Sequence, residues 1–182
     1  AAEAEAAEQM ERQVASLNNQ ALREGAWHAV FTSDQINGWL AATAPRVAPD
    51  LLPPGLHDPR VKIRPSGITI ACQADWGRLQ SVLSLDLDVY TDTAGILTLR
   101  FRQVRAGAVP WPMKPVLDGV SEACRHAGLR VDWEQAGGDP VARITLDHIE
   151  GRHGKFIQVQ QVRLEEGAIH VSGVTGREKD KG

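Results

Sequence analysis

The sequence predicts an α+β fold: a curved antiparallel sheet of about 6–8 strands packed on two or three helices, within a single domain. Two observations lead to this prediction. The apolar spacing changes from three and four residues to two at Val61, which marks the passage from helix to strand. Short turns then separate most of the strands, and the sequence lacks the regular alternation of strand and helix that builds a parallel sheet.

Length, composition and charge limit the class of protein. The 182 residues are enough for one domain with its own core. Lys and Arg number 20 and Asp and Glu 23, so the formal charge is −3. This balance argues against nucleic acid as a partner, because nucleic-acid-binding proteins usually present a broad positive face. No window approaches about 18 consecutive apolar residues, so we expect no membrane span in this sequence.

The first 24 residues predict an N-terminal helix, followed by a single α+β domain over residues 25–176 and a disordered tail over 177–182. Ala and Glu are compatible with helix, and the glutamates crowd its first turns, where the helix dipole is positive. The sequence starts without Met and without a signal-peptide pattern. We therefore expect a mature form that has lost an N-terminal anchor or signal. The apolar stripe of the helix consists of Ala7, Met10, Val14, Leu17 and Ala21.

A capping box predicts the start of a second helix. Thr32 is placed to cap the helix and Gln35 to reach back to it. Trp39 lies on the apolar side of this helix, and prolines end it. Residues 45–59 contain five prolines, so we expect a stiff connection here and not a flexible linker.

The clearest strand signal runs from Val82 to Tyr90 and returns after a turn at residues 91–95. Asp86 and Asp88 alternate with apolar residues on the first strand, and arginines do so on the second. We expect these charges to pair on the wet face, a solvated arrangement and not a glycosidase carboxylate pair. The inward-facing residues are Leu83, Leu85, Leu87, Val89, Leu97, Leu99 and Phe101.

A third helix is predicted from about Pro112 to Ala127, where Gly128 follows as a terminator. Its apolar stripe includes Val116 and Leu117. Alternation slips late in the sequence, which predicts a β-bulge at Gln160–Gln161. Shorter segments predict the remaining strands at residues 27–31, 61–63, 68–74, 129–133, 141–146, 156–164 and 168–174.

Motifs for common catalytic chemistry are missing. The sequence has no Gly-x-Ser-x-Gly, no Gly-x-Gly-x-x-Gly and no Walker loop. We therefore predict no catalytic residues, no cofactor and no enzymatic activity. A hydrolase with a scattered active site remains the third hypothesis, because site residues need not be adjacent in sequence.

Cysteine and histidine spacing gives no metal site. Cys72 and Cys124 lie far apart inside hydrophobic patterns, so we expect two buried thiols, with one long-loop disulfide as the alternative. The segment Asp147-His148-Ile149-Glu150-Gly151-Arg152-His153 holds two imidazoles and two carboxylates. Its spacing is unspecific, and we interpret it as a solvated hairpin tip. No metal ligands are predicted.

Tryptophan is over-represented among the aromatic residues, with five Trp against one Tyr and three Phe. Most are expected to pack in the core or at its rim. Trp111 differs, because it stands between two prolines and before Met113, where it could close an apolar groove or touch a partner or a membrane surface. The candidate contacts for an apolar ligand are Trp39, Leu85, Leu99, Phe101, Trp111, Met113 and Leu117.

Three short strings carry a family resemblance: Thr32 to Leu40, with Asn37 before Leu40, then Gly107 to Leu117, and Val162 to Gly167. Together they resemble bacterial membrane-anchored envelope proteins of the YpmS type. A more distant likeness is to tubular lipid-binding (TULIP-like) domains, in which a bent sheet rolls around a long helix. The resemblance implies an extracytoplasmic α+β domain of the cell envelope, held at the membrane only through an N-terminal segment absent from this sequence. It supplies no catalytic residues.

Two hypotheses for function follow. The first is a non-enzymatic domain that holds an apolar, lipid-like ligand between sheet and helix. It rests on the long apolar strand faces, the helix stripe and the loop bearing Trp111. The second is a structural or interaction module with a solid core and another envelope protein as its partner. Periodicity does not separate a solid core from a lined cavity.

Overall fold

The computed structural model describes residues 1–147, 149–150 and 154–177, and its strands form two antiparallel sheets. The larger has seven strands among these residues, in the order β2-β3-β4-β5-β8-β7 with β6 paired to β5. These strands are β2 (Leu56–Arg64), β3 (Gly67–Trp76), β4 (Leu79–Thr93), β5 (Ile96–Ala106), β6 (Val109–Pro110), β7 (Val131–Ala136) and β8 (Asp139–Thr145).

The smaller sheet has four described strands in the order β1-β11-β10-β9. They are β1 (Gly25–Thr32), β9 (Ile149–Glu150), β10 (Lys155–Glu165) and β11 (Ala168–Arg177). The predicted α+β class and antiparallel order are confirmed, although the strands divide over two sheets where we expected one. Alternation in a sequence marks which residues share a face but does not name the neighbouring strand. Here β1 pairs with the last strand of the chain.

Four helices occur among the described residues: α1 (Ala2–Ala21), α2 (Ser33–Ala42), α3 (Ala44–Val47) and α4 (Lys114–His126). The capping box is confirmed, because Gln35 N donates to Thr32 Oγ1 at 3.2 Å and Thr32 N donates to Gln35 Oε1 at 2.9 Å. None of these helices combines the length and the hydrophobicity needed to cross a bilayer.

Helices α1 and α2 cross at very close range because the residues at the crossing are small. A Cβ atom added to Gly38 of α2 would lie 2.6 Å from the Ala6 Cβ and 2.7 Å from the Glu3 carbonyl oxygen of α1. Thr43 Oγ1 donates to Glu11 Oε1 at 2.9 Å across the same contact. The small residues of α1 therefore allow it to pack closely on α2, and α1 is part of the folded domain.

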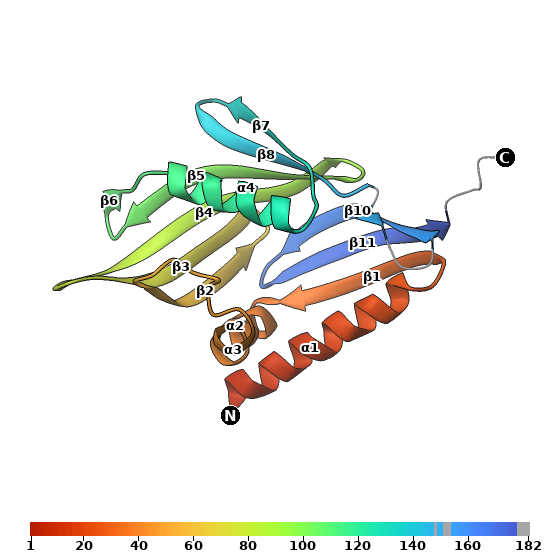
Figure 1. Cartoon of the computed structure of the whole chain (residues 1–182), viewed down its shortest axis with the longest axis horizontal. Coiled ribbons are helices and arrows are strands. Elements are labelled where there is room, and N and C mark those ends of the chain that lie inside the picture. Colours follow the sequence, from red (N-terminus) through yellow and green to blue (C-terminus); the bar gives the residue numbers. More distant parts are fainter. Residues whose placement is uncertain (148, 151–153, 178–182) are drawn as a thin grey trace.

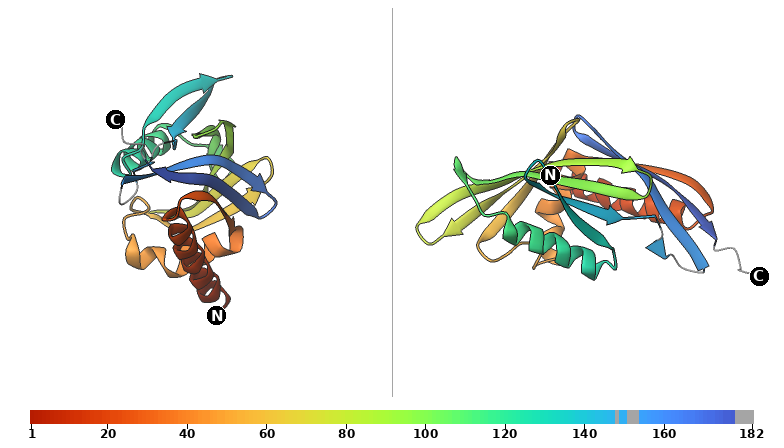
Figure 2. Two further views of the ribbon diagram at one scale, coloured as in Figure 1. Left: turned by 90° about the vertical axis from the view of Figure 1, so that its right-hand side faces the viewer. Right: turned by 90° about the horizontal axis from the view of Figure 1, so that it is seen from above.

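The two sheets meet at an open seam. Thr91 Oγ1 of β4 accepts a hydrogen bond from Val162 N of β10 at 3.3 Å, and Gly167 N donates to the Ile63 carbonyl oxygen of β2 at 3.0 Å. The expected bulge is confirmed, since the β10–β11 register shifts between Val159 and Gln161. The strands arch, and α2, α3 and α4 lie on the concave side of the arch (Figures 1 and 2).

The C-terminal tail expected over residues 177–182 is only partly described. Arg177 is the last residue of β11, and its Nε lies 2.5 Å from Glu24 Oε1. Arg177 therefore belongs to the folded domain. Residues 178–182 lie outside the described residues.

The hydrophobic core is small for a chain of this length. A cluster of Leu87, Phe101 and Ala142 lies beneath α4, and Phe101 is only 1% exposed. Among the described residues, the largest side chains that are this deeply buried are those of Phe101, Ile63 and Thr98. The chain exposes 11295 Å², whereas a compact monomer of 19.8 kDa exposes about 8,600 Å². The molecule is therefore more extended than a compact monomer of the same mass.

Candidate functional site

An apolar floor covers the concave side of the larger sheet. Ile70 of β3 lies opposite Leu85 of β4, and Leu85 lies opposite Val104 of β5. Directly opposed residues of antiparallel strands point to the same side, so the three form a continuous row. Leu83 and Cys72 extend this row as the next opposed pair. Ile70, Leu83 and Leu85 are half-buried, Cys72 and Val104 are buried, and Leu83 also lines a cavity above the sheet.

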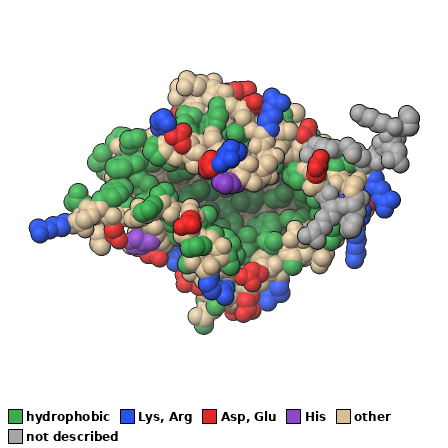
Figure 3. Space-filling view, viewed as in Figure 1, with side chains coloured by type: hydrophobic (Ala, Val, Ile, Leu, Met, Phe, Trp, Pro, Cys, Tyr) green, Lys and Arg blue, Asp and Glu red, His purple; other side chains and the backbone are tan. Residues whose placement is uncertain are grey.

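Two walls stand over this floor. On one side, Met113, Val116, Leu117 and Val120 of the α4 region pack against the core cluster. On the other side lie α2, α3 and the proline-rich segment that leads into β2. Figure 3 shows hydrophobic side chains lining a hollow that runs across this face of the molecule. We call this hollow, with its floor and two walls, the groove.

Two adjoining cavities belong to the groove, and only the second has ionisable residues, His57 and Asp58, in its lining. The first, of about 420 Å³, lies between the two walls and has no charged residue in its lining. The second, of about 240 Å³, lies under α3. Leu56 lines both. The first is lined by Pro53, Pro54, Leu56, Trp76, Leu83, Trp111, Pro112, Pro115, Val116 and Gly119. The second is lined by Leu40, Ala44, Pro45, Ala48, Pro49, Leu51, Leu52, Leu56, His57, Asp58 and Pro59.

A stacked tryptophan pair stands at one end of the groove. The rings of Trp76 and Trp111 are parallel to within 6°, with their centroids 4.6 Å apart. Trp76 is 37% exposed and Trp111 38%. Because exposed indole rings carry a large apolar area with one polar N–H, such a pair is suited to a boundary between water and an apolar phase.

A compact charge cluster lies beside the second cavity. His57 Nδ1 lies 2.8 Å from Asp58 Oδ2, and His57 Nε2 lies 2.6 Å from Asp75 Oδ2. The hydrogen bonds to Asp58 and Asp75 raise the pKa of His57 above its ordinary value of 6.5. The cluster ties the start of β2 to the end of β3, where the β2–β3 register shifts.

The opposite face of the larger sheet is charged, as expected from the alternation. Arg102 Nη2 lies 2.6 Å from Asp88 Oδ2, and Arg105 Nη2 lies 3.6 Å from Asp86 Oδ2. Asp139, the first residue of β8, joins the row, and its Oδ2 lies 2.9 Å from Arg100 Nη2. The sheet thus has one ionic and one apolar face, and the apolar face belongs to the groove.

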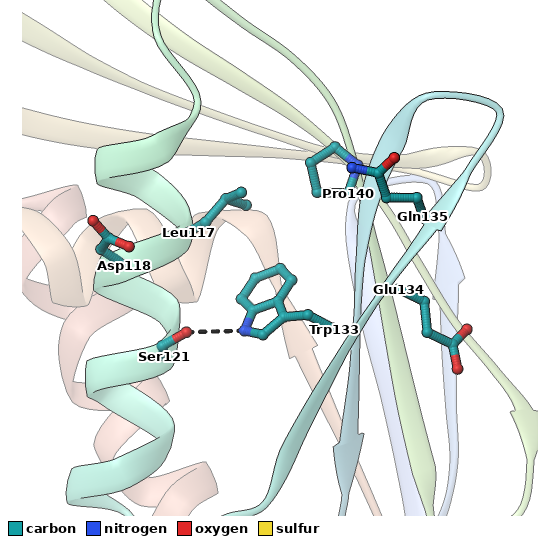
Figure 4. Close-up of a pocket in the computed structure, with 7 residues that line it drawn as sticks. All are labelled: Leu117, Asp118, Ser121, Trp133, Glu134, Gln135 and Pro140. Carbon is teal, nitrogen blue, oxygen red and sulfur yellow. Dashed lines mark hydrogen bonds between the residues drawn. The ribbon is translucent and has the colours of Figure 1, made fainter.

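A third cavity, of about 590 Å³, lies between α4 and the β7–β8 hairpin. Trp133 points from β7 toward α4, and its Nε1 donates to Ser121 Oγ at 2.9 Å (Figure 4). The same ring contacts Phe101, with centroids 5.7 Å apart. Glu134 points away from the helix (Figure 4). This mixed lining holds α4 against the sheet and gathers no set of catalytic groups.

Two histidines, His28 of β1 and His170 of β11, stack on each other with ring centroids 5.5 Å apart. His28 Nε2 lies 3.3 Å from His170 Nδ1, and His170 Nε2 lies 2.6 Å from Glu165 Oε2. These residues line none of the three cavities described above. Within the described ranges, no group of three or more ligating side chains is placed to hold a metal ion.

The histidine-containing segment considered from the sequence, residues 147–153, is only partly described. His148 and residues 151–153 lie outside the described residues. Both cysteines are described, and both are buried and free. Two buried thiols are therefore confirmed over the long-loop disulfide.

The structure places the predicted ligand contacts unequally. Trp111 lines the first cavity, whereas Phe101 is sealed in the core and has almost no surface to offer a ligand. Trp39 is half-buried on α2 and lines neither groove cavity; Leu40 does so in its place. The other four, Leu85, Leu99, Met113 and Leu117, are half-buried and pack against the core cluster.

Sequence reasoning missed one wall of the groove. Pro53, Pro54 and Leu56 face the start of α4 across the first cavity, and Gly119 leaves space on the helix side. The density of prolines at residues 45–59 was a usable signal, because stiff apolar segments hold a shape without a helix or strand. The sequence does not indicate that this segment faces α4, because their contact depends on long-range pairing of the strands.

Comparison of this chain with protein-family models, with curated proteins and with solved structures finds no match. The candidate site therefore stands on its geometry and chemistry alone.

Proposed function

We propose that this domain is a non-enzymatic binding module whose groove holds an apolar, lipid-like ligand between the larger sheet and helix α4. One observation carries the proposal: the floor includes the partly buried aliphatic side chains of Ile70, Leu83 and Leu85, and the cavity that Leu83 lines has no charged residue. Leaving such surface in water costs free energy, at about 25 cal/mol per Å². An occupant with an acyl chain removes this cost.

The size and lining of the first cavity support a ligand of this kind. Its 420 Å³ lies within the range of about 300–1,000 Å³ found for small-molecule sites. No charged side chain lines it, so a polar headgroup would find no partner there. A hydrocarbon chain fits the lining, with its polar end left at the rim.

The extracytoplasmic setting and the anchoring N-terminal segment belong to the same proposal. They rest on the resemblance to envelope proteins of the YpmS type, and a groove for an acyl chain suits such a setting. Cell fractionation of the full-length protein, with an accessibility assay for residues 1–177, tests this part separately.

Gly119 offers a direct test of ligand binding. It lies inside α4, lines the first cavity, and has no atom within 4 Å of the position where a Cβ would stand. The Cβ of Gly119→Leu therefore meets no neighbouring atom, its larger side chain takes up space in the cavity, and the helix gains propensity of about 0.5–1 kcal/mol. We expect a stable protein with at least tenfold weaker uptake of a fluorescent fatty acid.

Gly119→Ala is the matched control, because it makes the same backbone change and adds only one methyl group. We expect its uptake to equal that of the delipidated wild type. Uptake by Gly119→Leu at the wild-type level, or none by the delipidated wild type, contradicts the proposal. In the latter case, recovery of one stoichiometric protein partner would favour the interaction module.

A further inference from the structure

We propose that the tryptophan-bearing end of the groove docks on a phospholipid bilayer, so that the groove opens directly onto the membrane surface. This inference rests on the proposed function and adds a partner and an orientation to it. The docking surface, here called the end patch, consists of Trp76, Leu79, Val109 and Trp111.

The end patch joins side chains from three separate segments. Trp76 and Leu79 are opposed at the tip of the β3–β4 hairpin, so they share a side. Val109 of β6 lies opposite Ala106 of β5, and Trp111 N donates to the Val104 carbonyl oxygen at 2.9 Å. The stacked tryptophans close the arrangement. Because three segments contribute to it, the end patch depends on the folded structure and is not a property of one loop.

Exposure in the end patch is high for aliphatic residues. Leu79 is 71% exposed and Val109 64%. Single exposed aliphatic residues are ordinary, but several that adjoin one another mark a contact surface. The patch is continuous with the proposed binding site, because Trp76 and Trp111 also line the first groove cavity.

The charges around the end patch suit an anionic membrane. Arg78 is at the hairpin tip beside Leu79, is exposed, and forms no ion pair with any other described residue. Two carboxylates of this region have a basic partner: Asp75 Oδ2 lies 2.6 Å from His57 Nε2, which it shares with Asp58, and Asp118 Oδ2 lies 2.7 Å from Lys114 Nζ. When the aliphatic neighbours of an arginine enter the bilayer interface, its long side chain can still reach the lipid headgroups.

A bilayer fits the end patch better than a second protein surface. Stable protein interfaces bury about 800 Å² on each partner and involve about 20–30 residues a side. The end patch has four side chains, and a projecting hairpin tip carries two of them (Figure 1). Tryptophan with aliphatic residues and an unpaired cation is the composition found where proteins meet the headgroup region.

The test uses two double variants with equal chemistry. Leu79→Ser with Val109→Ser removes apolar groups from the end patch. Val14→Ser with Leu22→Ser removes the same residue types from exposed positions on and just after α1. Binding is measured by flotation with phosphatidylcholine vesicles, with and without phosphatidylglycerol. We expect the first variant to bind at least tenfold more weakly and the second to bind like the wild type.

Arg78→Gln probes the electrostatic part. We expect it to lose about fivefold in binding to vesicles that contain phosphatidylglycerol, with no change on pure phosphatidylcholine. An equal loss on both vesicle types overturns the role assigned to Arg78.

Fatty-acid uptake without vesicles separates this inference from the proposed function. The end-patch variant should keep its uptake and lose vesicle binding, whereas Gly119→Leu should do the reverse. Failure of wild-type uptake with patch-dependent vesicle binding intact would reject only the groove ligand. Absence of wild-type vesicle binding, or equal binding by the end-patch variant, overturns the docking proposal. So does a wild-type dimer that the end-patch substitutions convert to monomer.

Discussion

Asn37 takes the place of a neighbouring strand along the edge of the larger sheet. Its Oδ1 accepts from Val61 N at 2.7 Å, and its Nδ2 donates to the Val61 carbonyl oxygen at 2.9 Å. Because β2 is an edge strand, these backbone groups have no partner strand on that side. One side chain thus fixes α2 against the sheet and helps position one wall of the groove.

Replacing Asn37 should therefore destabilise the domain through the backbone of Val61. Asn37→Ala leaves both Val61 groups unpaired and should cost about 1–3 kcal/mol. Asn37→Asp keeps the acceptor and loses the donor, so an intermediate cost is expected. Urea unfolding measures both, and Asn18→Ala on exposed α1 is the control. An Asn37→Ala cost no larger than that of the control would refute this role.

His57 should make part of the stability depend on pH. Its pKa is raised in the folded state by Asp58 first and Asp75 second. The stabilisation is therefore complete below its ordinary pKa of 6.5 and is lost as pH rises through the raised folded value. We expect the Tm difference between wild type and His57→Gln to shrink from about pH 6 to about pH 9. A difference that stays constant across this interval would contradict the assignment.

At the scale of elements, two helical glycines have opposite surroundings. Gly38 permits α1 and α2 to touch, whereas Gly119 faces an empty cavity. Helix propensity alone treats the two positions alike. Packing makes the difference, because interiors have no room for an added methyl group without displacement of a neighbour.

The same substitution at these two glycines should change stability in opposite directions. Gly119→Ala should raise the free energy of unfolding by about 0.5–1 kcal/mol. Gly38→Ala should lower it by about 1–3 kcal/mol, because the new Cβ forces the helices apart. Chemical denaturation of both variants gives the comparison. Equal signs would show that α1 does not pack on α2 as described.

At the scale of the whole molecule, the two buried thiols report on the two layers that enclose the groove. Cys72 belongs to the sheet and Cys124 to α4. Burial raises the pKa of both thiols above the ordinary value of 9.0. Reaction therefore requires opening of the surrounding structure, since the thiolate is the nucleophile.

We expect both cysteines to react slowly with a thiol reagent in the native protein and rapidly in denaturant. Cys72→Ala and Cys124→Ala assign the two rates. A saturating fatty acid should slow both further, because a ligand that binds only the folded state suppresses opening. Rapid native reaction of either thiol would show that its layer is not closed as described.

The elements of the fold could be predicted from the sequence more fully than their assembly. The capping box at Thr32 and the bulge near Gln160 follow from local chemistry, so both were readable. The pairing of β1 with β11 joins segments separated by most of the chain and leaves no local trace. Phe101 shows the same limit at the site: alternation placed it inward but could not tell core from groove.

The open side of the groove has a consequence for selectivity. A closed tunnel selects acyl chains by length, because its end wall excludes any acyl chain that is too long. Here the two sheets meet at a seam and do not close into a tube. Each methylene that reaches the apolar floor adds about 0.8 kcal/mol, and those beyond it remain in water. Fatty acids of increasing length should therefore bind with an affinity that rises and then levels off, without a sharp cut-off.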